Sequence, residues 1–265
     1  MSSEETSSIF TLPMGAYAWY NSQGKAPLLV LCDHAINTIP PELGNLGVSV
    51  RDRQRHVAYD IGALPVAKII AEALDAPLIY TTTSRLVLDP NRNPSLNSFI
   101  PEKSDDVIIT ANQGLSKAQK KAREDQLFIP YHQAIEARLD QMEAQSGKAS
   151  VLISVHSFTP QLACNSELRP WHYGILWEED DRIAKPLITA LEALSDAPVG
   201  DNQPYSARDI EGETIRRHGT QRGLASALIE VRQDLIENAQ GQRQHAMLLL
   251  QALRPILMNF DYTRR

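Results

Sequence analysis

Two histidines and one glutamate lie at or near the ends of three separate apolar runs of the chain. His34 closely follows the run PLLVLC, His156 directly follows SVLISV, and Glu230 lies within ALIEV. Imidazole and carboxylate groups are the usual ligands of catalytic Zn²⁺, which keeps one coordination position open for water. Such an ion lowers the pKa of its water to about 7, so that the water can attack an amide carbonyl. These residues therefore predict metal-dependent hydrolysis.

The imidazoles and the carboxylate have different predicted roles. His34 and His156 are predicted metal ligands, and Glu230 is the predicted general base, which accepts a proton and passes it to the leaving amine. Burial of an unpaired carboxylate in an apolar strand is costly. Its presence there indicates a functional role, unless Glu230 simply pairs with Arg222 or Arg232.

The third metal ligand is less clear from the sequence. Asp60 begins a predicted helix and could point back to the sheet, although the same position also suits a helix N-cap. Asn37 lies three residues after His34, where an acid would complete a His-x-x-Glu pair, but an amide is a poor zinc ligand. Asp60 is therefore the predicted third ligand.

A second polar cluster, SRLVLDPNRNP, carries two arginines. Arg85 and Arg92 offer planar forks that clamp a carboxylate with two hydrogen bonds, and Asn91 adds an amide donor. All three are predicted to bind the substrate. The alternative is an internal Arg85–Asp89 ion pair that folds the loop, and one arginine can serve each purpose. His218, which precedes the run carrying Glu230, is a further predicted substrate contact or supporting residue.

The composition limits the class of partner. The chain has 265 residues, 43% of them hydrophobic, and its net charge of −6 includes no long acidic or basic block. Nucleic acid binding needs a concentrated cationic face, so we expect a small-molecule partner instead. Two distant cysteines fit a reducing compartment, and no apolar run approaches the roughly 20 residues of a membrane span. We expect a cytoplasmic protein with no signal peptide in its polar N-terminus, and the sequence leaves the oligomeric state open.

Short apolar runs alternate along the chain with longer amphipathic stretches. The runs are nearly all apolar, which is typical of strands covered on both faces, and the stretches repeat apolar residues at helical spacing. This order predicts one three-layer α/β domain over 1–265, with a mainly parallel sheet between helices, and a long functional loop at 89–113. The predicted strands are 27–32, 77–81, 150–155, 173–177 and 227–231, and the predicted helices are 61–74, 130–145, 181–195 and 235–259.

Ligands of open α/β sheets bind outside the carboxyl ends of the strands. His34, His156 and Glu230 are expected to meet at that edge, although they are distant in sequence. Tyr205 lies in a turn-rich loop at 201–209 and could reach the same region.

Several segments together resemble the N-formylglutamate amidohydrolase family, whose members look like relatives of the zinc exopeptidases. The resemblance implies a phosphorylase/hydrolase-like α/β core and a metal-dependent amidohydrolase. The matching segments, in chain order, are CDHAINTIP at 32–40, YDIGA at 59–63, SRLVLDPNRNP at 84–94, PYHQAI at 130–135, SVHSFTP at 154–160 and HGTQRGLASALIEVRQDLI at 218–236.

Site roles can be carried over from this resemblance by position. It implies His34 and His156 as metal ligands, Glu230 as the catalytic carboxylate, and Asn91 with Arg92 as a pair similar to the one that holds the substrate carboxylate in carboxypeptidases. The chain departs from the carboxypeptidase pattern at Asn37, and Asp60 in the YDIGA-like segment is the substitute ligand.

The predicted reaction is hydrolysis of N-formyl-L-glutamate or a similar N-acyl acidic amino acid, with Zn²⁺, or alternatively Co²⁺, as the cofactor. One alternative is an exopeptidase or deacylase that acts on a larger amide, and pocket size distinguishes the two. Another is a catalytically silent protein that binds a carboxylate with its arginines. Metal content distinguishes that last alternative from the enzymes.

Overall fold

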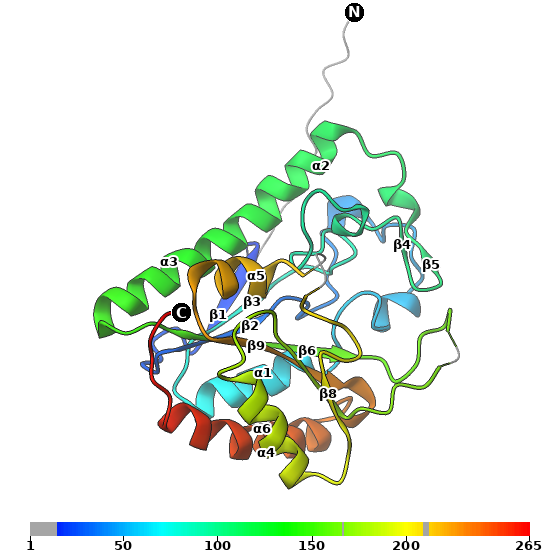
Figure 1. The fold of residues 1–265 in the computed structure, drawn as a ribbon. Helices are drawn as coiled ribbons and strands as arrows, with labels where there is room; N and C mark the ends of the chain where they lie inside the picture. Colours follow the sequence, from blue (N-terminus) through cyan, green and yellow to red (C-terminus); the bar gives the residue numbers. More distant parts are fainter. Residues whose placement is uncertain (1–14, 166, 209–211) are drawn as a thin grey trace, which may run out of the picture.

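The structure, a computed structural model, describes residues 15–165, 167–208 and 212–265 (Figure 1). Its main sheet has seven strands, β1 (Tyr17–Tyr20), β2 (Leu28–Cys32), β3 (Leu78–Thr81), β6 (Val151–Phe158), β7 (Tyr173–Leu176), β8 (Val199–Asp201) and β9 (Ser226–Arg232). Their order is β1-β3-β2-β6-β9-β7-β8. β3, β2, β6 and β9 run parallel, β8 runs parallel to β7, and β1 and β7 are antiparallel to their inner neighbours. The predicted mainly parallel sheet is confirmed.

Six α-helices accompany this sheet, α1 (Ala63–Ala73), α2 (Lys117–Arg123), α3 (Ile129–Ser146), α4 (Ala184–Leu194), α5 (Thr214–His218) and α6 (Ala239–Met258), among the residues described. Figure 1 shows α1, α4 and α6 below the sheet and α3 and α5 above it. Alternate side chains of β2 explain the three layers: Leu28 and Val30 pack with the lower helices, whereas Leu29 and Leu31 pack with α3. The predicted layers are confirmed.

The five predicted strands correspond to β2, β3, β6, β7 and β9, and the four predicted helices to α1, α3, α4 and α6. The sequence pattern did not reveal β1 and β8, which are short strands at the two edges of the sheet. It also did not reveal the short helices α2 and α5. Each of these elements is too short to show a repeat of buried residues.

The long loop predicted at 89–113 contains local structure. Two short strands, β4 (Lys103–Ser104) and β5 (Val107–Ile108), form an antiparallel pair within it. Buried Phe99 and Ile109 pack with Leu86 in an apolar cluster of their own. Asn112 donates to the carbonyls of Leu86 and Pro101 at 2.9 and 2.7 Å, which ties the end of the loop to its beginning.

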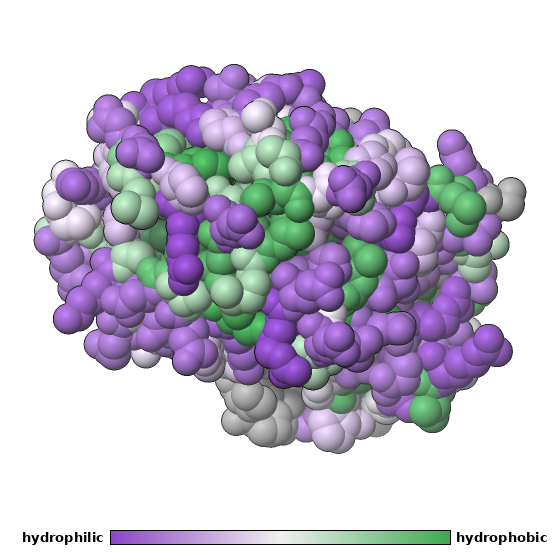
Figure 2. Space-filling model, turned by 90° about the horizontal axis from the view of Figure 1, so that it is seen from below, coloured by the Kyte–Doolittle hydropathy of each residue, from purple (hydrophilic) through white to green (hydrophobic). Residues whose placement is uncertain are grey.

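The outer face of the lower helices carries an apolar patch surrounded by polar side chains (Figure 2). On α6, Met247 is 55% exposed and contributes to a shallow groove together with Leu248 and Pro255. No helix within the described ranges is long and apolar enough to cross a membrane. The N-terminal segment expected to lack a signal peptide, residues 1–14, lies outside the described residues.

Candidate metal centre and active site

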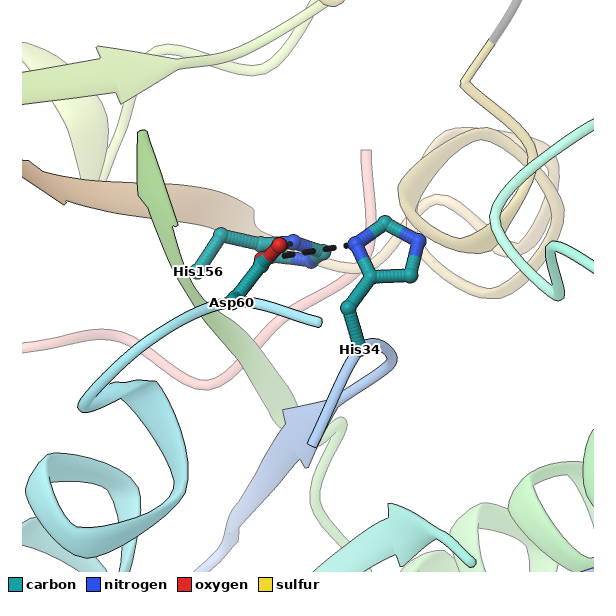
Figure 3. A group of neighbouring side chains, drawn as sticks. All are labelled: His34, Asp60 and His156. Carbon is teal, nitrogen blue, oxygen red and sulfur yellow. Dashed lines mark hydrogen bonds and ion pairs between the residues drawn. The ribbon is translucent and has the colours of Figure 1, made fainter. Parts of the chain in front are cut away.

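Two imidazoles and one carboxylate converge at the carboxyl edge of the sheet (Figure 3). The Nδ1 atoms of His34 and His156 lie 3.3 and 2.8 Å from the same oxygen, Asp60 Oδ2. One potential ligand atom from each residue lies within 4.8 Å of the others, and all three side chains are buried. This arrangement of donors is suited to a single divalent cation.

The chain brings these residues together from three separate segments. His34 follows β2, His156 lies in β6, and Asp60 lies in the turn before α1. The backbone N–H of Asp60 donates to the His34 carbonyl at 2.9 Å, which joins the turn to the end of β2. Gly62 occupies the N-cap position of α1. The N-cap alternative for Asp60 is therefore wrong, and its side chain faces the two rings.

The other nitrogen of each ring is held by an outer carboxylate. His34 Nε2 donates to Asp89 Oδ1 at 2.7 Å, and His156 Nε2 lies 3.1 Å from Asp33 Oδ2. Because a carboxylate can only accept, these contacts hold a proton on Nε2. Nδ1, which faces Asp60 Oδ2, is then the ring nitrogen that can carry either a second proton or a cation. Carboxylates that orient ligating histidines in this way also raise the basicity of the rings.

Further contacts fix the outer carboxylates. The Tyr131 hydroxyl donates to Asp33 Oδ1 at 2.7 Å, and Arg85 Nη2 donates to Asp89 Oδ2 at 2.6 Å. A second guanidinium nitrogen of Arg85 lies 3.4 Å from Asp60 Oδ1. Arg85 was predicted to bind the substrate, but the alternative ion pair with Asp89 is present and makes Arg85 part of the support of the centre.

The electrostatics of this cluster favour a positive charge between the rings. Burial alone would lower the pKa of His156, but its hydrogen bonds to Asp33 and Asp60 raise that pKa to about 10. Burial alone would raise the pKa of Asp60, but the neighbouring His34 and His156 rings lower it below its ordinary value. The buried acids therefore require a proton or a cation near the Nδ1 atoms.

Glu230 is a further acid beside this centre. It lies in β9 directly opposite His156 in β6, and only 6% of its surface is exposed. Its Oε2 atom is buried and has no hydrogen-bond partner among the residues described. Burial raises the pKa of Glu230 to about 7. Such a carboxyl group can exchange a proton near neutral pH.

The alternative ion pairs for Glu230 do not form. Arg222 pairs with Asp140 at the surface, and Arg232 pairs with Asp234 at 2.8 Å. Neither arginine compensates the carboxylate in β9.

A cavity of about 690 Å³ opens over the centre. The predicted ligands and base line it, and so do Arg85, Asn91 and Arg92. His56 and Tyr205 also reach it, which agrees with the expectation for Tyr205; the loop that carries Tyr205 is described as far as Arg208.

Asn91 has a structural contact as well as a place on the cavity wall. Its Oδ1 atom accepts hydrogen bonds from the backbone N–H groups of Glu213 and Thr214, at 3.0 and 2.9 Å. These contacts hold the start of α5 and fix the amide, so the Nδ2 donors are the part of Asn91 that remains for a ligand. Asn37 faces elsewhere and donates to the Arg53 carbonyl at 2.8 Å.

His218 lies behind the cavity and not on its wall. It is fully buried, and its Nε2 atom lies 2.7 Å from His132 Nδ1. His132 Nε2 in turn donates to the Pro90 carbonyl at 3.0 Å. The structure therefore brings His218 to the segment that precedes Asn91, and a supporting role fits this place better than direct contact with a substrate.

Sequence reasoning missed the residues that support the ligands. Asp33, Asp89, Tyr131 and Ser154 are buried polar groups around the two histidines. Ser154 Oγ, for example, lies 3.0 Å from His156 Nε2. Asp33 directly precedes His34, and Ser154 lies two residues before His156 on the same face of the strand, so a search for polar neighbours of the ligands would have found both.

Comparison with known proteins places this chain in a family. Curated protein sequences give no significant match. The gene product Atu2144 from Agrobacterium tumefaciens has a solved structure that is 34% identical, with a TM-score of 0.88 over 94% of this chain and 98% of that one. An N-formylglutamate amidohydrolase from Ralstonia eutropha JMP134 shares the fold, with 20% identity and a TM-score of 0.69 over 91% of this chain and 96% of that one. The model of the N-formylglutamate amidohydrolase family matches residues 26–237, and the chain belongs to this family.

Proposed function

We propose that this amidohydrolase is metal-dependent and cleaves N-formyl-L-glutamate or a similar N-acyl acidic amino acid. The observation that carries the proposal is the convergence of two Nδ1 atoms and one carboxylate oxygen in a cavity that also contains the unpartnered Glu230. The family supports an amide substrate.

The residues present fit a divalent cation. His34, Asp60 and His156 would hold it, and Asp33 and Asp89 would orient the two rings. Two nitrogen ligands and one oxygen ligand suit Zn²⁺, with Co²⁺ as an alternative. When bound, such a cation supplies a Lewis acid that polarises an amide carbonyl and acidifies water.

Glu230 would move the protons of the reaction. Its carboxylate accepts a proton from the attacking water and returns it to the leaving nitrogen, which lets the amine depart without a negative charge. Arg92 and the Nδ2 donors of Asn91 would bind a substrate carboxylate at the cavity wall.

The size of the cavity favours a second candidate, a deacylase that acts on a longer acyl chain. A cavity of about 690 Å³ falls in the range of roughly 300–1,000 Å³ that is typical of sites for drug-sized ligands. N-formylglutamate would fill only part of this space. A panel of N-formyl, N-acetyl and longer N-acyl glutamates would rank the two candidates by their kcat/KM values.

Replacement of the base tests the proposed function. We expect Glu230→Gln to lower kcat on the best substrate of the panel by roughly 10²–10⁴-fold, because the amide cannot accept the proton. The metal content per chain should remain at the wild-type value. Glu192→Gln, at an exposed position of α4, is the matched control and should leave kcat unchanged.

Two results would contradict the proposal. Wild-type protein that holds no divalent metal after purification and gains no activity from added Zn²⁺ or Co²⁺ would exclude metal dependence. Undiminished turnover in Glu230→Gln would remove Glu230 as the base, even if the protein proved to be a metalloenzyme.

A further inference from the structure

Arg208 is a cation on the cavity wall, and its nearest charge interaction with a described acid is the electrostatic one with Asp201. It lies in the loop after β8, and its guanidinium lies over the Trp177 ring, 4.3 Å from the ring centroid. Its Nε atom donates to the backbone carbonyl of Glu178 at 3.4 Å. Within the described ranges, no carboxylate lies at ion-pair distance from Arg208. The aromatic ring orients the guanidinium without neutralising it.

Two other arginines of the same cavity have carboxylate partners. Arg85 pairs with Asp89 and Asp60, which commits it to the support of the metal centre. Arg216 pairs with the Glu178 carboxylate at 2.7 Å. Arg208 is therefore better placed than either of them to bind an anion that enters from solvent.

Apolar side chains separate Arg208 from Glu230. Leu176 in β7 is paired with Leu228 in β9, and both line the cavity with Ile215 of α5. Leu228 lies two residues before Glu230 on the same face of the strand. Trp177 and Glu178, the residues that Arg208 contacts, follow Leu176 directly and so lie farther along the sheet from Glu230.

We propose that Arg208 binds the side-chain carboxylate of an N-acyl dicarboxylic amino acid. The methylene groups of the substrate would lie over Leu176, Ile215 and Leu228, while the amide lies at Glu230. The α-carboxylate would remain with Arg92 and Asn91. This inference rests on the proposed function and adds a specificity-determining residue to it. To reach Arg208, the substrate side chain must cross the apolar surface formed by Leu176, Ile215 and Leu228, which favours glutamate over aspartate, whose side chain is one methylene shorter.

A substitution of Arg208 tests this role by the ratio of two rates. The kcat/KM for N-formyl-L-glutamate should fall roughly 10- to 100-fold in Arg208→Gln, mostly through KM, because one charge-assisted contact is lost. The kcat/KM for neutral N-formyl-L-glutamine should change less than threefold. N-formyl-L-aspartate should be a poorer substrate than the glutamate derivative in the wild type and nearly equal to it in the variant.

A second substitution should lower the KM for N-formyl-L-glutamate, whereas Arg208→Gln should raise it. Glu178→Gln keeps an oxygen acceptor for Arg216 but removes the negative charge of the residue whose backbone carbonyl Arg208 contacts. We therefore expect a KM for N-formyl-L-glutamate that is roughly two- to fivefold lower, an effect that a merely structural role would not produce. Arg243→Gln, on the exposed side of α6, is the matched control and should leave both substrates unaffected.

Binding measurements separate this inference from the proposed function. Calorimetry with Glu230→Gln protein measures the affinity for both derivatives without turnover, and adding Arg208→Gln should weaken only the glutamate derivative. Equal effects on the two derivatives, or none, would overturn the role of Arg208. If wild-type protein hydrolyses neither derivative while Arg208 still discriminates between them in binding, the proposed function fails and the anion subsite stands.

Discussion

Two pairs of buried histidines in this protein have opposite electrostatic surroundings. His34 and His156 have ring centroids 4.9 Å apart, and His132 and His218 have centroids 5.0 Å apart. Carboxylates surround the first pair, and the pKa of His156 is raised to about 10. Burial without a bonded carboxylate lowers the pKa of His132 to about 4 and that of His218 to about 2.

The two pairs differ in their neighbouring acids and not in the histidines themselves, and it is the acids that suit the first pair to hold a cation. In the second pair, the Pro90 carbonyl can only accept, so His132 Nε2 carries a proton. His132 Nδ1 then accepts from His218 Nε2, and both rings remain neutral. The pair is a chain of hydrogen bonds that ends on the segment before Asn91.

The largest expected effect comes from removing one imidazole of the first pair. His156→Ala should abolish stoichiometric Zn²⁺ binding and lower kcat/KM at least about 10³-fold, because two ligands rarely retain a catalytic ion. Inductively coupled plasma mass spectrometry of the purified protein measures the metal. His172→Ala, at a partly buried histidine outside the cavity lining, is the control, and metal retention in His156→Ala would show that His156 is not a ligand.

A smaller change should make the first pair more like the second. Asp89→Asn removes the charge beside His34 Nε2 but keeps an oxygen acceptor. We expect the affinity for Zn²⁺ to fall roughly 10- to 100-fold, as is usual when a carboxylate behind a ligating histidine is lost. Competition with a fluorescent chelator measures the affinity. Asp140→Asn, at a surface ion pair, should have no effect, and an unchanged affinity in Asp89→Asn would contradict the supporting role.

The smallest effect concerns the second pair and appears as a dependence of stability on pH. Below pH 6.5 the unfolded chain protonates these histidines, whereas the folded protein keeps them neutral down to about pH 4 and about pH 2. The unfolded state therefore binds more protons, and each ring makes the free energy of unfolding fall by about 1.4 kcal/mol per pH unit as the pH drops below 6.5.

His218→Gln removes one titrating ring and keeps a donor for His132. Between pH 4.5 and 6, the slope of the unfolding free energy against pH should therefore decrease by about 1.4 kcal/mol per unit. Urea unfolding of the metal-free proteins measures this slope, and a slope equal to that of the wild type would indicate that His218 titrates normally in the folded state.

The sequence predicted the positions of the candidate site residues that lie in long central strands. His156 and Glu230 lie in central strands whose apolar runs are unmistakable, so their meeting at one edge followed from the parallel arrangement. Asp60 was harder, because a turn before a helix can direct an aspartate either to the helix N-terminus or away from it. The backbone bond between Asp60 and His34, which decides the direction, is a tertiary contact.

The roles of the arginines on the cavity wall were less predictable for a similar reason. Arg85 and Arg208 are both arginines in loops. The spacing of Arg85 and Asp89 allowed an ion pair as an alternative, but only the folded chain shows that this pair forms and that Arg208 lies over Trp177. Likewise, the contact of His218 with His132 joins two short segments that are 86 residues apart. Local spacing carries no information on such pairings.

The placement of Glu230 beside His156 is a property of the backbone ladder. β6 and β9 are paired continuously from Leu152 opposite Ser226 to Phe158 opposite Arg232. Because side chains alternate between faces, a slip of one residue would turn Glu230 toward α1, α4 and α6 and leave the histidines without their acid. The distance between the proposed base and the proposed ion site is therefore fixed by interstrand hydrogen bonding, which single side-chain substitutions in the cavity leave intact.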